Sequence, residues 1–304
     1  MSSSAVEVSD KETVNLANVT PAAATAEESF ARKAFRSFCG NKFALVSAII
    51  LLTIILSTIL AGVISPYSPL EGHAKDRLLP IGSPGHILGT DEQGRDMLTR
   101  MLYGGRMTLL AGFVPVIVAA CLGGGLGIIA GYFGGRIGTL IMRVLDIFYA
   151  FPAVILSIAI SAALGQGLLN IMISIAIVFT PPVARVMETA VKRIRNQEFI
   201  EAAKSSGAGP FAIMRRHVLP NVFSDLFVFS TSQISLGIVI AAGLSFLGLG
   251  VAPPTPEWGV MLNSIKQLIF VDPMLTIVPG LGLFLTALTI NICADGIRDA
   301  LQVK

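Results

Sequence analysis

The chain has 304 residues, of which 53% are hydrophobic and only 13% are charged. With a mean hydropathy of +0.76 it has too little polar side-chain surface for a water-soluble fold, so the composition predicts an integral membrane protein. The net charge of +3 does not indicate a nucleic-acid-binding protein, because no basic face with stacking aromatic residues accompanies it.

The amino-terminal part of the chain divides into a tail and a short amphipathic stretch. Residues 1–27 are rich in Ser, Ala, Thr and acidic residues and lack the basic-then-apolar order of a signal peptide, so we expect a disordered cytosolic tail. A capping box at 25–28 precedes residues that place aromatic side chains on one helical face and basic side chains on another. We predict an interfacial elbow helix at 28–42; the alternative is a basic anchor without a helix.

Six nearly charge-free stretches follow, each close to the roughly 20 residues that cross a bilayer as a helix. We predict an all-α fold with six transmembrane helices, at 43–64, 107–132, 140–164, 168–186, 226–249 and 273–294. The last five belong to a helical core at 107–298, and residues 299–304 form a short carboxyl terminus.

The distribution of basic residues predicts the orientation in the membrane. With the amino terminus inside, 16 of the 22 Lys and Arg residues lie in or next to cytosolic segments, as the positive-inside rule requires. Both termini and the polar segment 188–222 are then cytosolic, whereas 65–106 and 251–272 are extracytoplasmic.

The segment 65–106 is too long and polar for a simple turn, and its four prolines rule out one continuous helix. We predict an external subdomain whose second half, from Asp91 to Arg106, is helical. Asp91, Arg95 and Asp96 are candidates for ion pairs that fix this subdomain on the core; contact with substrate is the alternative.

Glycines recur every four residues in the second predicted span, at Gly123, Gly127, Gly131 and Gly135. In lipid such a stripe allows close approach of another helix, either in this chain or in a partner subunit. The glycines do not form a phosphate-binding loop, since no Gly-x-x-x-x-Gly-Lys-Ser/Thr pattern occurs.

Arg143 and Asp146 lie three residues apart in the third predicted span. An acidic residue within a membrane is a functional candidate by default, but at this spacing the arginine can neutralise it, so we interpret the two as a structural ion pair near the cytosolic side. Pro152 is expected to kink or open this helix, and Pro181-Pro182 to do the same in the fourth span.

The longest charge-bearing island in the second half of the chain is Glu198 to Asn221, which we call the docking segment. Asn196 is positioned to cap a short helix, Gly207 to end it in a left-handed turn, and Pro210 to start a second helix. The second helix is expected to stop before Pro220. The pattern predicts a compact pair of helices that protrudes between two spans.

The segment 251–272 is rich in proline and contains Glu257 and Trp258. We assign both residues to the external face, where a tryptophan suits the membrane interface.

The docking segment resembles the EAA loop of bacterial ABC importer permeases. The positions that fill this pattern are Glu201, Ala202, Ala203, Gly207, Leu219 and Pro220. The motif at 88–96, with Asp91, Arg95 and Asp96, and the stretches 244–250 and 253–259 are similar to the C-type permease subunit of dipeptide, oligopeptide and nickel importers. The resemblance covers about residues 30 to 301.

This resemblance implies a type I ABC importer permease fold and import of peptides, nickel, glutathione or opine-like solutes across a bacterial inner membrane. It implies a heterodimer with a homologous permease, two ATP-binding subunits and a solute-binding protein. The six matching positions of the docking segment would contact the ATPases.

No constellation of catalytic side chains is found along the chain, and Cys39, Cys121 and Cys293 are too scattered for a metal site, so we predict neither enzymatic activity nor a cofactor. The alternative function is a proton-coupled secondary transporter that acts alone. The single convincing intramembrane acid and the lack of an internal repeat argue against it.

Overall fold

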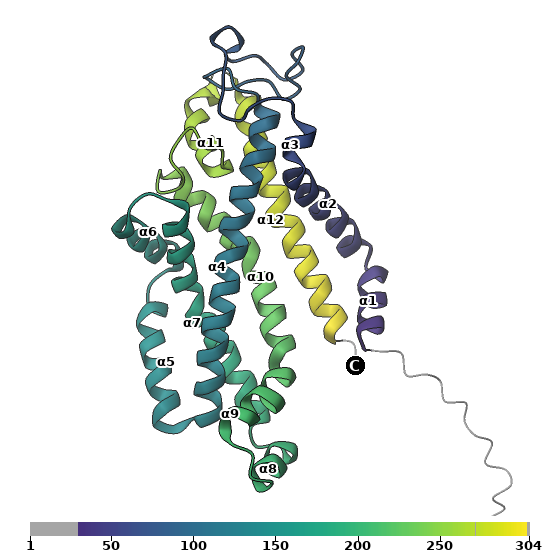
Figure 1. Ribbon diagram of the computed structural model, residues 1–304, viewed down its shortest axis with the longest axis vertical. Helices are drawn as coiled ribbons and strands as arrows, with labels where there is room; N and C mark the ends of the chain where they lie inside the picture. Colours follow the sequence, from purple (N-terminus) through teal and green to yellow (C-terminus); the bar gives the residue numbers. More distant parts are fainter. Residues whose placement is uncertain (1–29, 271, 303–304) are drawn as a thin grey trace, which may run out of the picture.

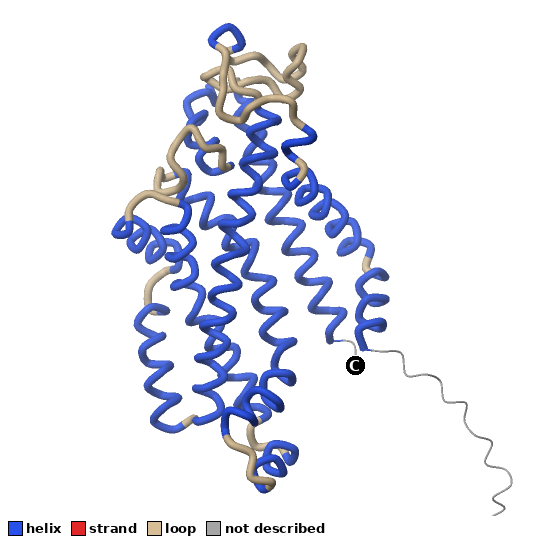
Figure 2. Tube along the Cα trace, viewed as in Figure 1, coloured by secondary structure: helices blue, strands red, loops and turns tan. Residues whose placement is uncertain are grey.

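The computed structural model describes residues 30–270 and 272–302, and nearly all regular structure in this range is helical (Figure 1). The tail 1–27 and the capping box at 25–28 lie outside the described residues. Figure 2 shows that most of the loop structure gathers at the end of the molecule opposite α8.

Within the described residues, five helices are long and apolar enough to cross a membrane. They are α2 (Lys42–Ile59), α4 (Met97–Phe133), α7 (Leu168–Ile194), α10 (Leu219–Phe246) and α12 (Pro273–Gln302). Two shorter helices, α5 (Gly135–Tyr149) and α6 (Ala153–Leu164), meet the same criterion only as a bent pair, which makes a sixth. Each of the six stretches expected from the sequence therefore corresponds to a helix or to this pair.

The third predicted span is broken, because α5 and α6 meet at an angle of 85°. Pro152 lies at the break with φ −56° and ψ 128°, immediately before α6. A proline disfavours helical geometry in the residue before it, which explains why the break falls at Phe151-Pro152. The proline predicted to open this span is the residue at the break.

Pro181-Pro182, expected to kink or open the fourth span, do not open it, since α7 continues as one helix through both prolines. Neighbouring helices can stabilise a membrane helix at such positions. Here α4 packs closely along α7, and the Thr180 hydroxyl donates to the Ala176 carbonyl oxygen at 2.7 Å.

The glycine stripe of α4 packs against α7 of the same chain. The contacting pairs are Gly123 with Thr180, Gly127 with Ala184 and Gly131 with Val191. A Cβ atom added at Gly127 would lie only 2.4 Å from the Ala184 carbonyl oxygen, so this close approach requires glycine. Gly135, which completes the repeat in the sequence, has no neighbour within 4 Å of an added Cβ atom.

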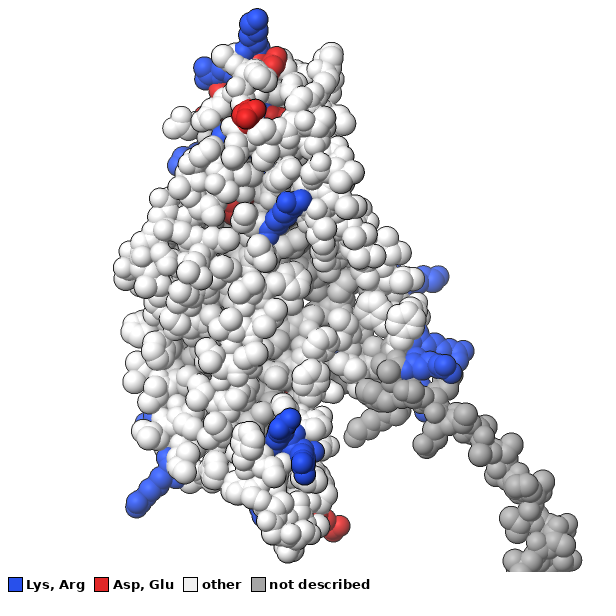
Figure 3. All heavy atoms as spheres, in the orientation of Figure 1, with Lys and Arg blue, Asp and Glu red and all other residues white. Residues whose placement is uncertain are grey.

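The amino-terminal helix α1 (Phe30–Gly40) is followed directly by α2, whose first turn is capped by Asn41 accepting from the Ala44 amide at 3.2 Å. Figure 1 shows α1 and α2 beside α12, at one edge of the bundle. Charged side chains lie mostly toward the two ends of the molecule, and a broad band of other residues separates them (Figure 3).

Two segments meet at the end of the molecule opposite α8 (Figure 1). The first covers residues 65–96 and contains one short turn of helix, η2 (Ala74–Asp76), and two isolated β-bridges. The second follows α10 and contains α11 (Trp258–Ile265) and η4 (Lys266–Phe270). The helix predicted from Asp91 begins only at Met97, because Asp96 caps it by accepting from the Thr99 amide at 2.7 Å.

Candidate functional site

The docking segment begins with α8 (Glu198–Ser205), which protrudes from the bundle with α9 (Pro210–Ile213) (Figure 1). Gln197, not Asn196 as predicted, is the N-cap residue, and its side chain makes no capping hydrogen bond. The main-chain oxygen of Gln197 accepts from the amides of Ile200 and Glu201 at 3.0 and 3.2 Å. Glu198 and Glu201 in the first turn interact favourably with the positive end of the helix dipole. This interaction stabilises the start of the helix in place of a side-chain cap.

The turn predicted at Gly207 is present, with φ +80°. The Gly207 amide donates to the Lys204 oxygen at 3.0 Å and the Ala208 amide to the Ala203 oxygen at 3.1 Å, which is the Schellman pattern of a helix end. An added Cβ atom at Gly207 would meet nothing within 4 Å, so backbone conformation rather than space requires glycine here.

Buried side chains root the docking segment in the transmembrane core. Ile200, Ile213 and Val218 are at most 1% exposed and belong to one apolar cluster with residues of α7 and α10. Ala203, half-buried, packs against the same cluster. Close packing therefore connects α8 and α9 to α7 and α10.

The outer surface of the docking segment carries the other predicted contact residues. Glu201, Ala202 and Gly207 are exposed. Beside them Phe211 is 73% exposed and Phe199 is 37% exposed, and sequence reasoning did not select either residue. Large aromatic side chains in an otherwise polar loop were the signal that could have found them, because such exposed apolar groups commonly mark an interface.

The prediction that the second helix of this segment stops before Pro220 is wrong. After α9 the chain forms a five-residue π-helix, η3 (Met214–Val218), and continues into α10, where Pro220 lies in the first turn. The Leu219 amide donates to the Met214 oxygen, five residues back. This wider, π-helical turn lies just before Pro220. Proline has no amide hydrogen, and none is needed in the first turn of a helix. Leu219 and Pro220 are both exposed.

At the opposite end of the molecule, the structure brings together Asp91, Arg95 and Asp96, and each is at most 5% exposed. The Arg95 Nε atom donates to Asp91 Oδ2 at 2.7 Å, and the other carboxylate oxygen accepts from two main-chain amides. Asp96 caps α4 and accepts from His86 Nδ1 at 2.9 Å. The His86 side chain, 11% exposed, is thus also part of this cluster.

Arg100, which the sequence analysis did not select, joins the two segments at this end. Its Nε atom lies 3.3 Å from Asp91 Oδ2. Its Nη1 atom donates to the main-chain oxygens of Pro69 and Pro254, at 2.9 and 3.2 Å. One buried guanidinium thus ties residues 65–96 to the segment after α10.

Glu257 and Trp258, which the sequence assigned to the external face, lie in the segment opposite α8 (Figure 1) and are buried there, at 1% and 3% exposed. Glu257 caps α11 by accepting from the amides of Gly259 and Val260, each at 3.0 Å, and from the Thr108 hydroxyl at 2.9 Å. The Trp258 Nε1 atom donates to the Met101 oxygen at 2.9 Å. Packing of α11 against α10, α12 and α4 turns both side chains inward.

The ion pair predicted between Arg143 and Asp146 is not formed. Asp146 pairs with Arg185 of α7, while Arg143 is exposed on α5. Packing of α5 against α7 brings the two residues together although they are 39 positions apart.

Among residues 30–270 and 272–302, the structure has no group of three or more His, Cys, Asp or Glu side chains placed to hold a metal ion.

The chain is similar to inner-membrane components of transport systems. Residues 123–304 match the family described as binding-protein-dependent transport system inner membrane component, and residues 29–80 match the N-terminal transmembrane domain of oligopeptide transport permease C. The first match covers the docking segment, and the second covers α1 and α2.

Curated relatives match nearly the whole chain. The di/tripeptide transport system permease protein DppC of Pseudomonas aeruginosa is 42% identical over 89% of this chain and 91% of its own length. The glutathione transport system permease protein GsiD of Pectobacterium atrosepticum is 38% identical over 90% of this chain and 91% of its own length. Among solved structures, an inward-facing MetNI methionine ABC transporter aligns with a TM-score of 0.55 at 20% identity, over 68% of this chain and 98% of that chain. At 20% identity, this last similarity shows that the chain shares the fold of that transporter chain, and no more than the fold.

Proposed function

The chain belongs to the family of binding-protein-dependent transport system inner membrane components, and we propose that its docking segment is the lever through which ATPase subunits drive it. It is a multi-pass permease subunit of an ABC importer and is not itself catalytic. ATP hydrolysis takes place on a partner, so the permease must receive mechanical work through a contact.

The observation that carries this proposal is the combination of an exposed outer surface and a buried root in one short segment. Glu201 and Ala202 are available to a partner, whereas Ile200 and Ile213 are locked into the core. An ATPase that grips the outer surface would shift the segment as a rigid body. Because the root packs on α7 and α10, these two helices would shift with it and open the pathway alternately to each side.

The family implies ATPase subunits and a solute-binding protein as partners. We further propose that this chain pairs with a homologous permease to form a heterodimer that encloses the pathway. Its docking segment and both termini would face the cytosol, in agreement with the excess of basic residues in those segments. The binding protein would then deliver solute to the end formed by 65–96 and 251–272.

The proposed solutes are small peptides. The relatives that match about nine-tenths of the chain are named for transport of di- and tripeptides and of glutathione, which is itself a tripeptide. Nickel or opine-like solutes are less well supported by these relatives. The family membership also argues against the alternative of a proton-coupled carrier that acts alone.

Two glycines of the docking segment allow a matched test. Gly207→Val places a β-branched residue at φ +80°, whereas Gly209→Val places the same residue at φ −69° and ψ 156°, which valine adopts readily. Neither added Cβ atom meets an atom within 4 Å. We expect Gly207→Val to abolish ATP-driven dipeptide uptake in proteoliposomes that contain the whole complex, and Gly209→Val to retain it. Equal uptake in the two variants would refute the coupling role.

A further inference from the structure

Four charged side chains form two ion pairs that connect α7 to its neighbours. Arg185 pairs with Asp146 of α5. Arg193 Nη2 lies 2.9 Å from Asp225 Oδ2 of α10. The four side chains are 36% to 64% exposed, so both pairs lie open on the surface of this chain.

One of the two pairs lies within the predicted spans, since Asp146 belongs to the stretch 140–164 and Arg185 to the stretch 168–186. Arg185 precedes the end of α7 at Ile194 by nine residues, about 13 Å at 1.5 Å per residue. Arg193 and Asp225 lie closer to the docking segment, since Arg193 is one residue from the end of α7 and Asp225 directly precedes the predicted span 226–249. Exposed charges at the depth of Asp146 and Arg185 are costly in lipid, and charged groups inside membranes normally face water or protein.

Both ion pairs include an arginine from one polar side of α7. On α7, Arg185, Thr189 and Arg193 follow at four-residue spacing, which places them on one side of the helix. Together with Asp225 they line a hollow of about 320 Å³. A second hollow of about 560 Å³ lies between the α5–α6 break, α7 and α10; most of its lining is apolar, and Tyr149 and Gln233 are its polar side chains.

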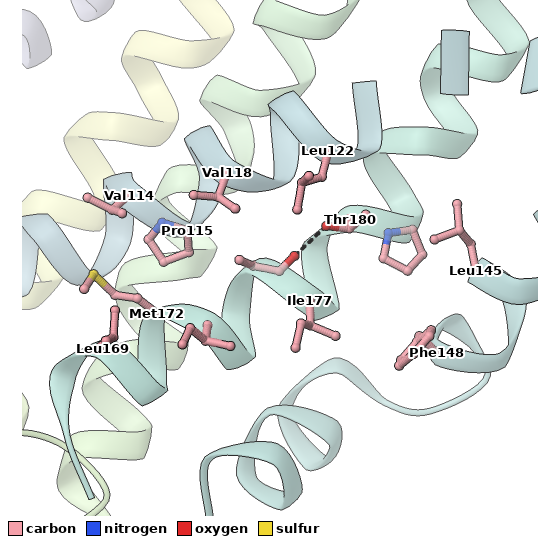
Figure 4. A pocket seen from close by; sticks show the side chains of 13 residues that line it. Val114, Pro115, Val118, Leu122, Leu145, Phe148, Leu169, Met172, Ile177 and Thr180 are labelled. Carbon is pink, nitrogen blue, oxygen red and sulfur yellow. Dashed lines mark hydrogen bonds between the residues drawn. The ribbon is translucent and has the colours of Figure 1, made fainter. Parts of the chain in front are cut away.

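Another cavity of this chain has a different character. Figure 4 shows the hollow of about 350 Å³ between α4, α5 and α7, which is lined by apolar side chains such as Val118, Leu122 and Phe148. Thr180 is its polar side chain, and the dashed line marks the hydrogen bond that engages its hydroxyl with the Ala176 oxygen. This cavity suits lipid chains, whereas the face with the ion pairs suits water and a charged solute.

We propose that the face formed by Asp146, Arg185, Thr189, Arg193 and Asp225 lines the half of the solute pathway next to the docking segment. We propose in addition that its two ion pairs are the contacts for a solute that carries both an ammonium and a carboxylate group. This inference rests on the proposed function and names the residues that the solute meets.

The pairs are suited to an exchange of partners. A zwitterionic peptide can place its carboxylate on an arginine and its ammonium on an aspartate while the protein pair opens, so no charge is left alone. The Arg185 guanidinium also lies 5.3 Å from the centroid of the Tyr149 ring, a cation–π contact that does not involve Asp146.

Cysteine labelling tests whether the face is in water. In the assembled complex, with Cys39, Cys121 and Cys293 replaced by serine, Thr189→Cys is compared with Ile147→Cys, which is 63% exposed on α5 next to Asp146. A membrane-impermeant cationic methanethiosulfonate is added on the side of the docking segment. We expect Thr189→Cys to react at least about tenfold faster, because lipid excludes the charged reagent from Ile147. Equal rates would refute the pathway assignment, as would a Thr189→Cys that reacts only when the chain is separated from its partner permease.

Protection by solute tests the second part of the proposal. A free dipeptide at millimolar concentration should slow the modification of Thr189→Cys, whereas the same dipeptide acetylated at its amino end and amidated at its carboxyl end should not. Equal protection by both peptides, or by neither, would overturn the role of the ion pairs. Both experiments run without ATP, so they can fail while the glycine test of coupling succeeds, and the reverse is equally possible.

Discussion

Arg100 on α4 donates a hydrogen bond to the main-chain oxygen of Pro254, a residue 154 positions further along the chain, at 3.2 Å. The same guanidinium lies against Asp91 and is only 3% exposed as a residue. At the end of the molecule opposite the docking segment, the buried Arg100 side chain therefore holds residues 65–96 against the segment that follows α10.

Replacement of Arg100 by methionine should destabilise this end of the molecule. The variant leaves the carbonyl oxygens of Pro69 and Pro254 without this donor and removes one of the two cations beside Asp91. Loss of one partner from a buried charge cluster costs about 3–5 kcal/mol, which should appear as a lower Tm of the purified complex.

The control is Arg77→Met, since Arg77 is exposed and donates a single hydrogen bond to the Glu92 oxygen at 2.6 Å. Its effect should stay within about 1 kcal/mol. An equal loss of Tm in the two variants would contradict the role assigned to Arg100.

Glu257→Ala should release α11 from the core. The substitution removes the acceptor of two main-chain amides and of the Thr108 hydroxyl, all of them buried. Each buried donor left without a partner costs about 1–3 kcal/mol. Hydrogen exchange should therefore accelerate in residues 258–265, while Glu257→Gln, which retains one carbonyl oxygen, should show a smaller acceleration. Unchanged protection of α11 in Glu257→Ala would contradict this account.

The glycine stripe offers a matched pair of substitutions on α4. A Cβ atom at Gly127 would lie 2.4 Å from the Ala184 oxygen and 2.6 Å from Cβ of Met187, whereas a Cβ atom at Gly125 would meet nothing within 4 Å. Gly127→Ala should cost about 1–3 kcal/mol through overpacking against α7. Gly125→Ala should be neutral or slightly stabilising. A fluorescence-based thermal unfolding assay that ranks the two variants in the opposite order would exclude the packing described here.

The root and the outer surface of the docking segment should be separable by mutation. Ile200→Ala removes a fully buried side chain and should cost about 2–5 kcal/mol, with ATP hydrolysis no longer linked to uptake. Phe211→Ala changes a side chain that is 73% exposed, so it should leave the Tm unchanged and weaken retention of the ATPase during purification. A Phe211→Ala variant that unfolds, or that retains the ATPase fully, would argue against an exposed docking surface.

Local chemistry explains what could be predicted from the sequence. The left-handed turn at Gly207, the helix start at Pro210 and the break at Pro152 each depend on the conformational limits of one or two residues. Hydropathy likewise located the spanning segments, because a bilayer demands long apolar stretches.

The wrong predictions mostly concern contacts that depend on how the helices pack against one another. Asp146 has an arginine three residues away, yet it pairs with Arg185 because α5 lies against α7. Trp258 was placed at the membrane interface because composition cannot reveal that α11 folds inward. Pro220 was expected to end a helix, and the π-helical turn before it lies outside the usual helix rules.

The central claim, that an ATPase grips the outer surface of the docking segment, is tested most directly by a crosslink from Ala202. Ala202→Cys in the background without Cys39, Cys121 and Cys293 is treated with a short thiol-to-amine crosslinker in the purified complex, with the partly exposed Ser68→Cys at the other end as the control. The account predicts that Ala202→Cys is joined to the ATPase and that Ser68→Cys is not. A complex that hydrolyses ATP normally, yet yields no crosslink from Ala202→Cys or is labelled there only by a reagent added from outside the cell, would contradict it.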